Sequence, residues 1–350
     1  MTIPLVYALH SGNLYGTERM ALVTAEGLAN EYPPIIFAPP GPALQEAARM
    51  GFETHAFSSA KEFAITLRPI FARHREMIFM ATGVVHSLAC LAWNVLYRRQ
   101  VHHFHLVHGG TDELLSYGRK RRLNGTGVKL VAVSEFVKSR LIAHGANPNQ
   151  IVVIENFLPD DQIQKAPKRP AFSRSEIHRV VVVSRVDPIK RIDLLLDAVE
   201  QNEALRRLDF RILGTGSEFE QLKNRAAQSC PNVAFVGFTS AVAEELAASD
   251  LLLHLCPVEP FGLAILEAMA ARLPVLVPDS GGASSIIEPG ISGYRFQANS
   301  AADLGQQLQR VGALTALELN STVEQAWNRL LSHYSTQSGL DQYRRLIASG

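Results

Sequence analysis

The chain has 350 residues, of which 47% are hydrophobic and 19% are charged, and its formal net charge is +1 at neutral pH. This composition is typical of an ordered globular protein and excludes an intrinsically disordered chain. The near-zero net charge gives no reason to expect nucleic acid as a partner. The length exceeds what one small core needs, so two domains are expected.

The three cysteines, Cys90, Cys230 and Cys256, lie far apart and lack metal-ligand spacing. They do not resemble a disulfide framework, so a reducing cytosol is expected. Residues 1–9 lack a basic segment and a cleavage signature, and they predict a core strand instead of a signal peptide. No apolar run approaches the roughly 18–20 residues of a membrane span. We expect a cytoplasmic protein, with peripheral attachment to the inner membrane face left open.

Short runs of Val, Ile and Leu alternate with longer amphipathic segments along the chain. In chain order, the predicted strands are residues 3–9, 35–38, 77–81, 104–108, 129–133, 151–154, 180–184, 210–213, 234–236, 251–255 and 274–277. Strands that are apolar almost throughout predict a sheet covered on both faces, and hence parallel βαβ units. Between strands, residues 190–200 repeat apolar side chains at helical spacing. The predicted fold class is α/β.

A proline-rich, charged and aperiodic segment at residues 159–175 predicts a linker between two domains. The first domain is then residues 1–165 and the second is residues 166–325, both doubly wound and Rossmann-like. Residues 326–350 predict a helical C-terminal segment.

Two carboxylates, Glu259 and Glu267, stand eight positions apart around a Phe-Gly turn. The turn follows the strand-like run 250–256 and precedes a helix-like run from Leu263 onward. Glu259 is then expected in a strand-to-helix loop and Glu267 two turns into the helix. Both face the carboxyl end of a parallel sheet, where open α/β sheets bind ligands. Carboxylates there suit the paired hydroxyl donors of a sugar or ribose.

Two cations follow the strand 180–183. Arg185 lies at the strand end and Lys190 opens the predicted next helix, so both are expected to converge on the same crevice. Charge-assisted hydrogen bonds from such groups contribute roughly 1.5–3 kcal/mol each, which suits a diphosphate whose charge grows as it leaves.

The spacing of Glu259 and Glu267 resembles the Glu-x7-Glu signature of retaining glycosyltransferases of family 4, which have the GT-B fold. That resemblance implies two Rossmann-like domains facing across a cleft, with the C-terminal segment crossing back onto the first. It assigns catalysis to His108, Arg185, Lys190 and Glu259. It assigns the donor to Gly12, Gly16, Gly214, Gly216, Gly237, Phe261, Gly262, Leu263 and Glu267.

The chain departs from the family pattern at several positions. Arg191 stands where the family usually has glycine after the lysine, and Ser285 stands where glutamate is frequent. Phe157 replaces the glycine that commonly follows Asn156, which leaves Asn156 as a candidate on the acceptor side. Gly12 follows Ser11, where the family often has two glycines.

Histidines are dense between positions 86 and 108, but their spacing does not match a metal-ligand helix. His108, at a strand end, matches the family histidine that contacts the donor sugar, and His86 is a candidate for the acceptor side. His102, His103 and His105 are expected on the solvent face or in the core.

No Asp-x-Asp occurs in the sequence, so no metal site and no cofactor are predicted. The resemblance implies a metal-independent, retaining transfer of a sugar from a nucleotide-diphosphate sugar to the hydroxyl of a carbohydrate or lipid-linked acceptor. The alternatives are a catalytically silent nucleotide-sugar-binding protein of the same fold and a nucleotide-sugar epimerase. The basic run 119–122 predicts a solvated loop, with contact to an anionic acceptor or a membrane surface as the alternative.

Overall fold

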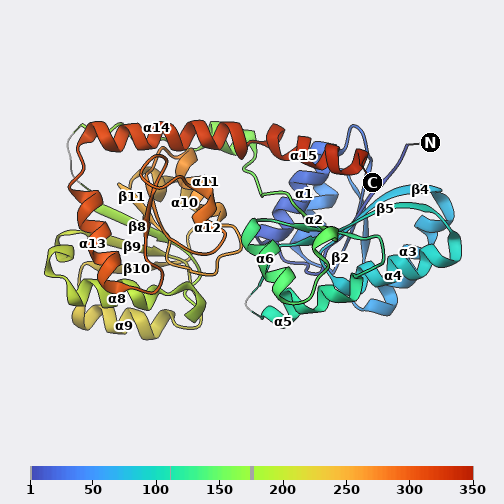
Figure 1. Ribbon diagram of the computed structural model, residues 1–350, viewed down its shortest axis with the longest axis horizontal. Coiled ribbons are helices and arrows are strands. Elements are labelled where there is room, and N and C mark those ends of the chain that lie inside the picture. The colour runs from blue at the N-terminus through green and yellow to red at the C-terminus, as the bar shows by residue number, and fades with distance from the viewer. Residues whose placement is uncertain (1, 111, 174–176, 350) are drawn as a thin grey trace. The chain divides into compact units, whose positions relative to one another are not determined.

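The computed structural model describes residues 2–110, 112–173 and 177–349, which form two compact units (Figure 1). The first unit contains Met1–Asn156 and Thr336–Gly350, and the second contains Phe157–Ser335. Each unit is built around one parallel sheet.

The first unit has a seven-stranded sheet in the order β3-β2-β1-β4-β5-β6-β7. Its strands are β1 (Leu5–Ala8), β2 (Pro34–Ala38), β3 (Glu53–Ala56), β4 (Glu76–Ala81), β5 (Gln100–Val107), β6 (Lys129–Ala132) and β7 (Ile151–Val153). Its helices are α1 (Gly16–Leu28), α2 (Pro42–Arg49), α3 (Ala60–Arg73), α4 (Val84–Tyr97), α5 (Glu113–Ser116), α6 (Glu135–Ala143) and α15 (Thr336–Ala348). The strand order reverses between β1 and β4.

The second unit has a six-stranded sheet in the order β10-β9-β8-β11-β12-β13. Its strands are β8 (Arg179–Val183), β9 (Asp209–Leu213), β10 (Val233–Gly237), β11 (Leu251–Leu253), β12 (Val275–Pro278) and β13 (Tyr294–Phe296). Its helices are α7 (Asp160–Lys165), α8 (Ile192–Gln201), α9 (Phe219–Ser229), α10 (Val242–Ala247), α11 (Leu263–Ala270), α12 (Ala283–Ile286), α13 (Ala301–Gly312) and α14 (Ala316–His333). The order reverses between β8 and β11.

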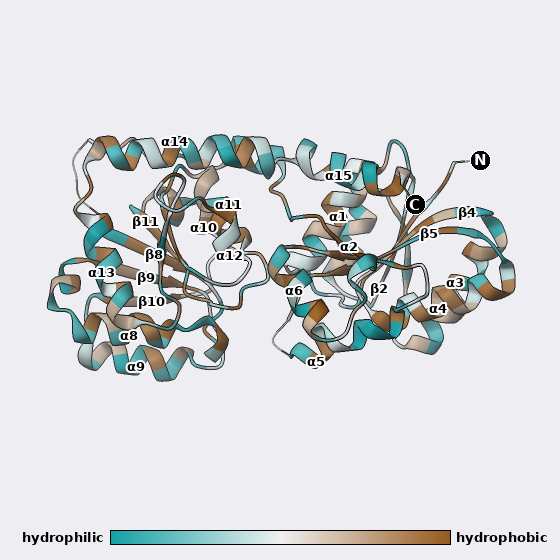
Figure 2. Ribbon diagram, viewed as in Figure 1, coloured by the Kyte–Doolittle hydropathy of each residue, from teal (hydrophilic) through white to brown (hydrophobic). Residues whose placement is uncertain are grey.

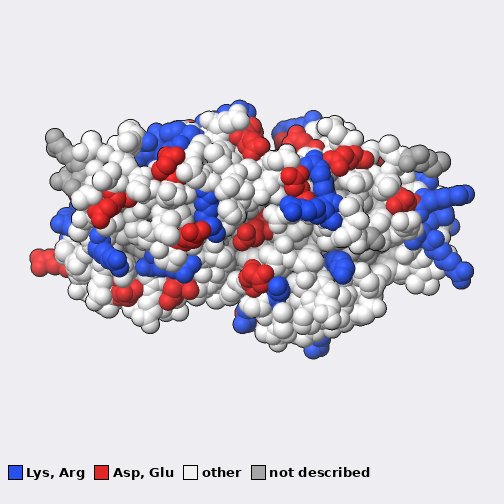
Figure 3. All heavy atoms as spheres, turned by 45° about the horizontal axis from the view of Figure 1, so that its top comes forward, with Lys and Arg blue, Asp and Glu red and all other residues white. Residues whose placement is uncertain are grey.

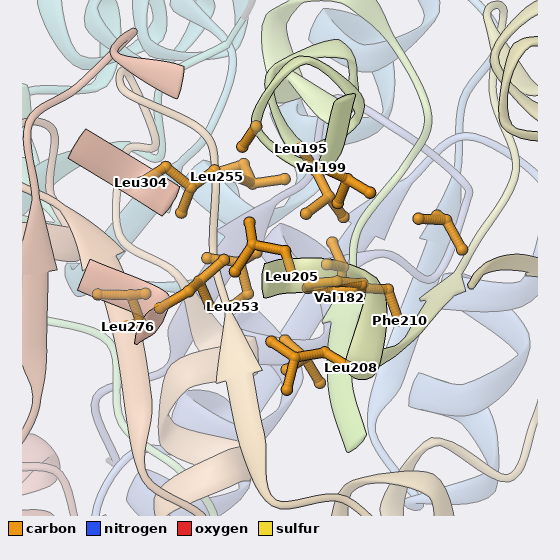
Figure 4. Close-up of a cluster of buried hydrophobic side chains, with 14 of the residues drawn as sticks. Val182, Leu195, Val199, Leu205, Leu208, Phe210, Leu253, Leu255, Leu276 and Leu304 are labelled. Atoms are coloured by element: carbon orange, nitrogen blue, oxygen red, sulfur yellow. The ribbon is translucent and has the colours of Figure 1, made fainter. Parts of the chain in front are cut away.

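Burial explains which strands the sequence predicts. All four residues of β1 are fully buried, and apolar colour follows the central strands in Figure 2. The core of the second unit joins side chains of β8, β9, β11 and β12 to α8 and α13, including Val182, Leu195, Phe210 and Leu304 (Figure 4). Two strands were not predicted, β3 and β13. Both lie at a sheet edge, are short and leave side chains partly exposed, so they lack an apolar run.

The predicted linker at residues 159–175 is wrong for its described part, which packs into the second unit. It contains α7, which contacts α11. Farther along, Arg169 pairs with Asp250 at 2.7 Å and its amide donates to the Ala271 carbonyl, while Phe172 is buried. Residues 174 and 175 lie outside the described residues. The boundary between the units therefore falls between residues 156 and 157, before the segment 159–175 that was predicted to be a linker.

The C-terminal segment divides between the units at a different residue from the one predicted. α14 packs against α11 of the second unit, whereas α15 packs against α1 of the first. Leu340 of α15 packs against Gly27, where a Cβ atom would lie 2.3 Å from a Leu340 methyl group. The crossing occurs at Ser335 and Thr336, ten residues beyond the expected position at 325 and 326. Beside it, the Leu158 amide donates to the Tyr334 carbonyl at 2.8 Å.

The core of the first unit contains His103, whose side chain is buried edge-on against Phe79 with ring centroids 4.9 Å apart. Neither ring nitrogen has a hydrogen-bond partner among the described residues. Burial lowers the pKa of His103 from 6.5 to about 3. His105 is also buried and bonds to the Ser87 hydroxyl, and His102 pairs with Glu76.

We expect replacement of His103 by leucine to reduce the loss of stability in acid. Because the folded pKa is depressed, the histidine's contribution is complete above pH 6.5 and is lost as the pH falls toward the folded value. At about pH 5 the free energy of unfolding is lower by about 2 kcal/mol on account of His103. The amount depends only on the pKa of the unfolded histidine, because the folded histidine is still neutral at that pH. Urea unfolding of both proteins at about pH 8 and pH 5 measures it. An identical pH dependence in the two proteins would show that His103 is already protonated or hydrated in the fold.

Candidate functional site

The candidate donor site lies where the strand order of the second unit reverses. β8 and β11 are neighbours in this sheet, so the loops that follow them meet at one edge. Lys190 comes from the loop after β8, and Glu259 comes from the loop after β11. Open α/β sheets bind ligands at this switch point, outside the carboxyl ends of the strands.

Lys190 and Glu259 form a partly buried ion pair. The Lys190 ammonium donates to Glu259 Oε2 at 2.5 Å, and the two side chains are only 17% and 16% exposed. Burial alone would raise the pKa of Glu259, but the charge of Lys190 and its hydrogen bond to the carboxylate lower that pKa below its usual value. The pair therefore holds a carboxylate and an ammonium ready at the switch point, each with further hydrogen-bonding capacity for a ligand.

His254 is a member of this site that the sequence analysis missed. It directly follows β11, is buried, and its Nε2 atom lies 3.5 Å from Glu259 Oε2. Burial lowers the pKa of His254 to about 4, with Glu259 and Lys190 acting in opposite directions. It is neutral near pH 7. Its signal in the sequence is a polar residue in the otherwise apolar run 251–256.

A glycine turn holds the Glu259 loop in place. The Gly282 amide donates to the Glu259 carbonyl at 2.6 Å, and the Ser280 hydroxyl donates to the Pro257 carbonyl. A Cβ atom on Gly282 would lie 2.0 Å from the Pro260 carbonyl oxygen. The two loops approach so closely that only glycine fits, which fixes the backbone from which Glu259 projects.

The other predicted donor residues of this loop lie around the start of α11. Gly262 caps the helix with a φ of 112°, a conformation that favours glycine. Leu263 begins the helix, and Glu267 lies half-buried in its second turn. The side chain of Phe261 is buried against Tyr334, with ring centroids 5.9 Å apart. For Phe261 the structure therefore shows a packing role.

Arg185 does not join the pair of Lys190 and Glu259. Its side chain is 64% exposed and pairs with Asp187 at 2.8 Å. The pKa of Asp187 is lowered by a hydrogen bond from the Ser217 amide and by the charges of Arg185 and Lys190. Asp187 was not predicted from the sequence. Its carboxylate pairs with Arg185 and accepts from the Ser217 amide, and so links the loop after β8 to the loop after β9.

Lys190 ends a short 3-10 helix, Pro188–Lys190, and the expected helix starts two residues later at Ile192. The residue between them, Arg191, has a φ of 55°. This left-handed conformation accounts physically for a preference for glycine at this position. Arg191 occupies it and pairs with Asp193 at 3.1 Å.

Glycines bring the ends of β8, β9 and β10 together. A Cβ atom on Gly214 would lie 2.0 Å from the Ser184 carbonyl oxygen, and one on Gly216 would lie 2.4 Å from that of Val186. The Gly214 amide donates to the Gly237 carbonyl at 2.8 Å. These three predicted donor glycines thus allow the backbone to pack closely beside the switch point.

The remaining candidates belong to the first unit. A pocket of about 400 Å³ opens where its strand order reverses, and His10, Thr82, His86, His108 and Lys120 help to line it. Burial lowers the pKa of His86 and that of His108 to about 4, with a smaller effect of His10. Both are therefore neutral near pH 7.

Two of the predicted donor glycines lie outside this pocket. Gly12 passes so close to the Pro39 and Pro40 carbonyls that a Cβ atom would lie 2.7 and 2.6 Å away. Gly16 begins α1, and Asn156 is half-buried at the end of the unit. For Gly12, close packing of the backbone is sufficient to explain the glycine.

Within the described ranges, no three His, Cys, Asp or Glu side chains gather as metal ligands. The search for membrane spans, made over the same ranges, finds no helix with the length and apolar character to cross a bilayer. Acidic and basic side chains are interspersed over most of the face in Figure 3, as the near-zero net charge leads one to expect.

Residues 164–322 match the family described as Glycosyl transferases group 1. The second unit is a group 1 glycosyl transferase domain. The match falls within Phe157–Ser335 and includes the pair of Lys190 and Glu259. The predicted family is thereby confirmed for this domain.

Named relatives agree with this family. The chain is 29% identical over 212 residues to a poly(ribitol-phosphate) alpha-N-acetylglucosaminyltransferase of Staphylococcus aureus, covering 57% of this chain and 40% of that protein. It is 28% identical over 211 residues to the N-acetyl-alpha-D-glucosaminyl L-malate synthase of Bacillus anthracis, covering 57% and 54%. The chain thus spans about half the length, or less, of the curated relatives it matches.

Solved structures show the fold of the whole chain. HepE of Anabaena, solved in complex with UDP, superposes with a TM-score of 0.84 at 16% identity, covering 99% of this chain and all of that one. The predicted α/β class and the GT-B fold are therefore confirmed.

Proposed function

We propose that the protein is a metal-independent, retaining glycosyltransferase that moves a sugar from a nucleotide-diphosphate sugar to an acceptor hydroxyl. The observation that carries this proposal is the partly buried pair of Lys190 and Glu259 at the switch point of a group 1 domain. An ammonium and a carboxylate fixed side by side suit a ligand with an anionic diphosphate next to a sugar rich in hydroxyl donors.

In this proposal each charged group acts on one part of the donor. Lys190 and Arg185 stabilise the leaving diphosphate, together with the backbone amides of Gly262 and Leu263 at the start of α11. Glu259 accepts hydrogen bonds from the sugar hydroxyls and Glu267 accepts them from the ribose. Neutral His108 accepts or donates a hydrogen bond near the anomeric centre, where its lowered pKa keeps it uncharged.

The configuration at the anomeric carbon is proposed to be retained without a nucleophile from the enzyme. The acceptor hydroxyl attacks from the face that the diphosphate leaves, and the leaving phosphate oxygen takes the proton of that hydroxyl. This step requires no strong base from the protein, which agrees with the lowered pKa of Glu259. Closure of the active site would exclude water from the reacting sugar.

Neither alternative is favoured. An epimerase would require an acid and a base in the first unit, and the candidates there are histidines whose pKa values lie well below 7. A silent binding protein would be expected to have lost a member of the pair, and both members are present and in contact.

The donor and the acceptor are proposed by class. A neighbour solved with UDP makes uridine nucleotides the first donors to test. The acceptor is a carbohydrate, free or lipid-linked. We place the reaction in the cytoplasm, where three buried, free cysteines are compatible with a reducing environment, with peripheral contact at the inner membrane face.

Binding of nucleotide sugars tests the proposal directly. We expect UDP-, GDP- or ADP-sugar to bind in calorimetry in the presence of EDTA, and Glu267→Ala to weaken that binding about 10- to 100-fold, because charge-assisted hydrogen bonds to ribose are lost. Glu220→Ala, an exposed carboxylate on α9 of the same unit, is the matched control and should leave affinity unchanged. No binding of any nucleotide sugar would refute the proposal. Binding abolished by EDTA would refute metal independence.

A further inference from the structure

The pocket of the first unit is lined by cationic side chains and, among its described residues, by no carboxylate. Lys120, Arg119 and Arg122 line it from the 3-10 helix Gly118–Leu123, opposite the ends of β1, β4 and β5. The other polar side chains in its wall are hydroxyls and histidines, and none of the described lining residues is Asp or Glu. The wall therefore offers an excess of positive charge and hydrogen-bond donors.

Lys120 is the most unusual member of this wall. Its side chain is buried, with 8% of the residue exposed, and its ammonium donates to the Leu115 carbonyl at 3.0 Å. Within the described part of the chain, no carboxylate oxygen lies within ion-pair distance of it. A buried ammonium without a counter-ion is costly, so its retention requires a compensating group. Burial and the charge of Arg119 lower the pKa of Lys120 to about 8.

The nearest acids in sequence do not compensate this charge. Asp112 accepts from the Leu115 amide at 3.0 Å and so caps α5. Glu113 pairs with Arg140 and lies 3.3 Å from His144. Both carboxylates are engaged away from the pocket, and the cations that line it are left for a ligand.

Neutral groups lie deeper in the same pocket. The His10 ring bonds to the Thr82 hydroxyl at 2.8 Å, while His86 Nδ1 and His108 Nε2 are buried without a partner among the described residues. Neutral imidazole nitrogens of this kind can bind the hydroxyls of a polyol. A volume of about 400 Å³ lies within the range of small-molecule sites.

We propose that this pocket binds an acceptor through an anionic group, a phosphate or a carboxylate, held by Lys120, Arg119 and Arg122. The inference rests on the proposed function and narrows its acceptor to anionic molecules that also carry hydroxyls. The same chemistry is available from a small phosphorylated polyol or from the headgroup of an anionic lipid, and the experiment distinguishes these sources.

Calorimetry with a matched pair of ligands tests the proposal. Glycerol 3-phosphate and glycerol differ only in the phosphate, and we expect the first to bind at millimolar concentration and the second not to bind. Lys120→Met should weaken the binding of glycerol 3-phosphate about 10- to 100-fold, as loss of a charge-assisted hydrogen bond predicts. Arg121→Gln removes a charge from the same basic run outside the pocket wall and should change affinity less than about twofold.

Vesicles identify the source of the anion. Retention on phosphatidylglycerol vesicles, but not on phosphatidylcholine vesicles, with loss in Lys120→Met, would assign the anion to a lipid headgroup. Failure of both glycerol 3-phosphate and phosphatidylglycerol vesicles to bind would overturn the proposal, as would binding that Lys120→Met leaves unchanged. Arg122→Gln, at an exposed position, replaces Lys120→Met if that variant does not fold.

Binding of UDP, measured on the same samples, separates this inference from the proposed function. A protein that binds UDP but neither anionic probe contradicts only the anionic acceptor. A protein that binds neither UDP nor a nucleotide sugar contradicts the glycosyltransferase itself.

Discussion

Replacing Lys190 by methionine is expected to remove nearly all sugar transfer and to destabilise the second unit. Turnover should fall about 10²- to 10³-fold, the usual effect of losing one group that stabilises charge in a transition state. The free energy of unfolding should fall by about 3 kcal/mol, because Glu259 would remain largely buried without its counter-ion. Turnover with the identified donor and urea unfolding measure the two effects separately.

The double variant Lys190→Met/Glu259→Gln is the control for this prediction. Removing both charges takes away the buried, unpaired carboxylate, so most of the lost stability should return while turnover stays low. If turnover returned together with stability, Lys190 would have only a structural role. If Lys190→Met kept full stability, Glu259 would be hydrated or protonated instead of paired.

Gly214→Ala is expected to cost about 4 kcal/mol or more of folding stability, which is exceptional for the addition of one methyl group. The backbone there has a φ of 136°, and the new Cβ atom would lie 2.0 Å from the Ser184 carbonyl oxygen. The ends of β8 and β9 would have to separate, which displaces the loops that carry Arg185 and Asp187. Nucleotide binding should be lost together with stability.

Gly237→Ala separates close contact from backbone strain. Gly237 has a φ of 85°, but a Cβ atom there would meet only the Phe219 ring, at 3.8 Å. The cost should therefore be the strain of a left-handed alanine, about 1–2 kcal/mol. Urea unfolding of both variants measures the difference. Equal losses would show that strain, and not the approach of Ser184, sets the requirement for glycine at position 214.

The central strands of both sheets were predictable because burial on two faces requires an unbroken apolar run. β1 and β8 are such runs, whereas β3 is a sheet edge in which Glu53 and Ala56 are exposed. Edge strands are stabilised by pairing with a neighbour, which a single sequence does not reveal. The unit boundary was misplaced for a similar reason, since the contacts of Arg169 with Asp250 and the Ala271 carbonyl join positions far apart in the chain.

The sequence indicated candidate residues for the site but not which of them contact one another. The spacing of Glu259 and Glu267 and the cations Arg185 and Lys190 predicted ligands for a nucleotide sugar, and that role stays a prediction. The contact of Lys190 with Glu259 depends on β8 lying beside β11. His254 was missed because its role follows from burial next to Glu259. Lys120 was predicted to lie in a solvated loop, since a basic run gives no sign of which member will point inward.

The order of the two units along the chain has a consequence for synthesis. The second unit is an insertion into the first, entered at Phe157 and left at Ser335, where its two ends are paired by the bond from Leu158 to Tyr334. α15, which supplies buried Leu340 and Tyr343 to the first unit, follows the insertion. During translation the inserted unit therefore has all of its residues before its host does. The host unit, although its sheet is synthesised first, is the last to be completed.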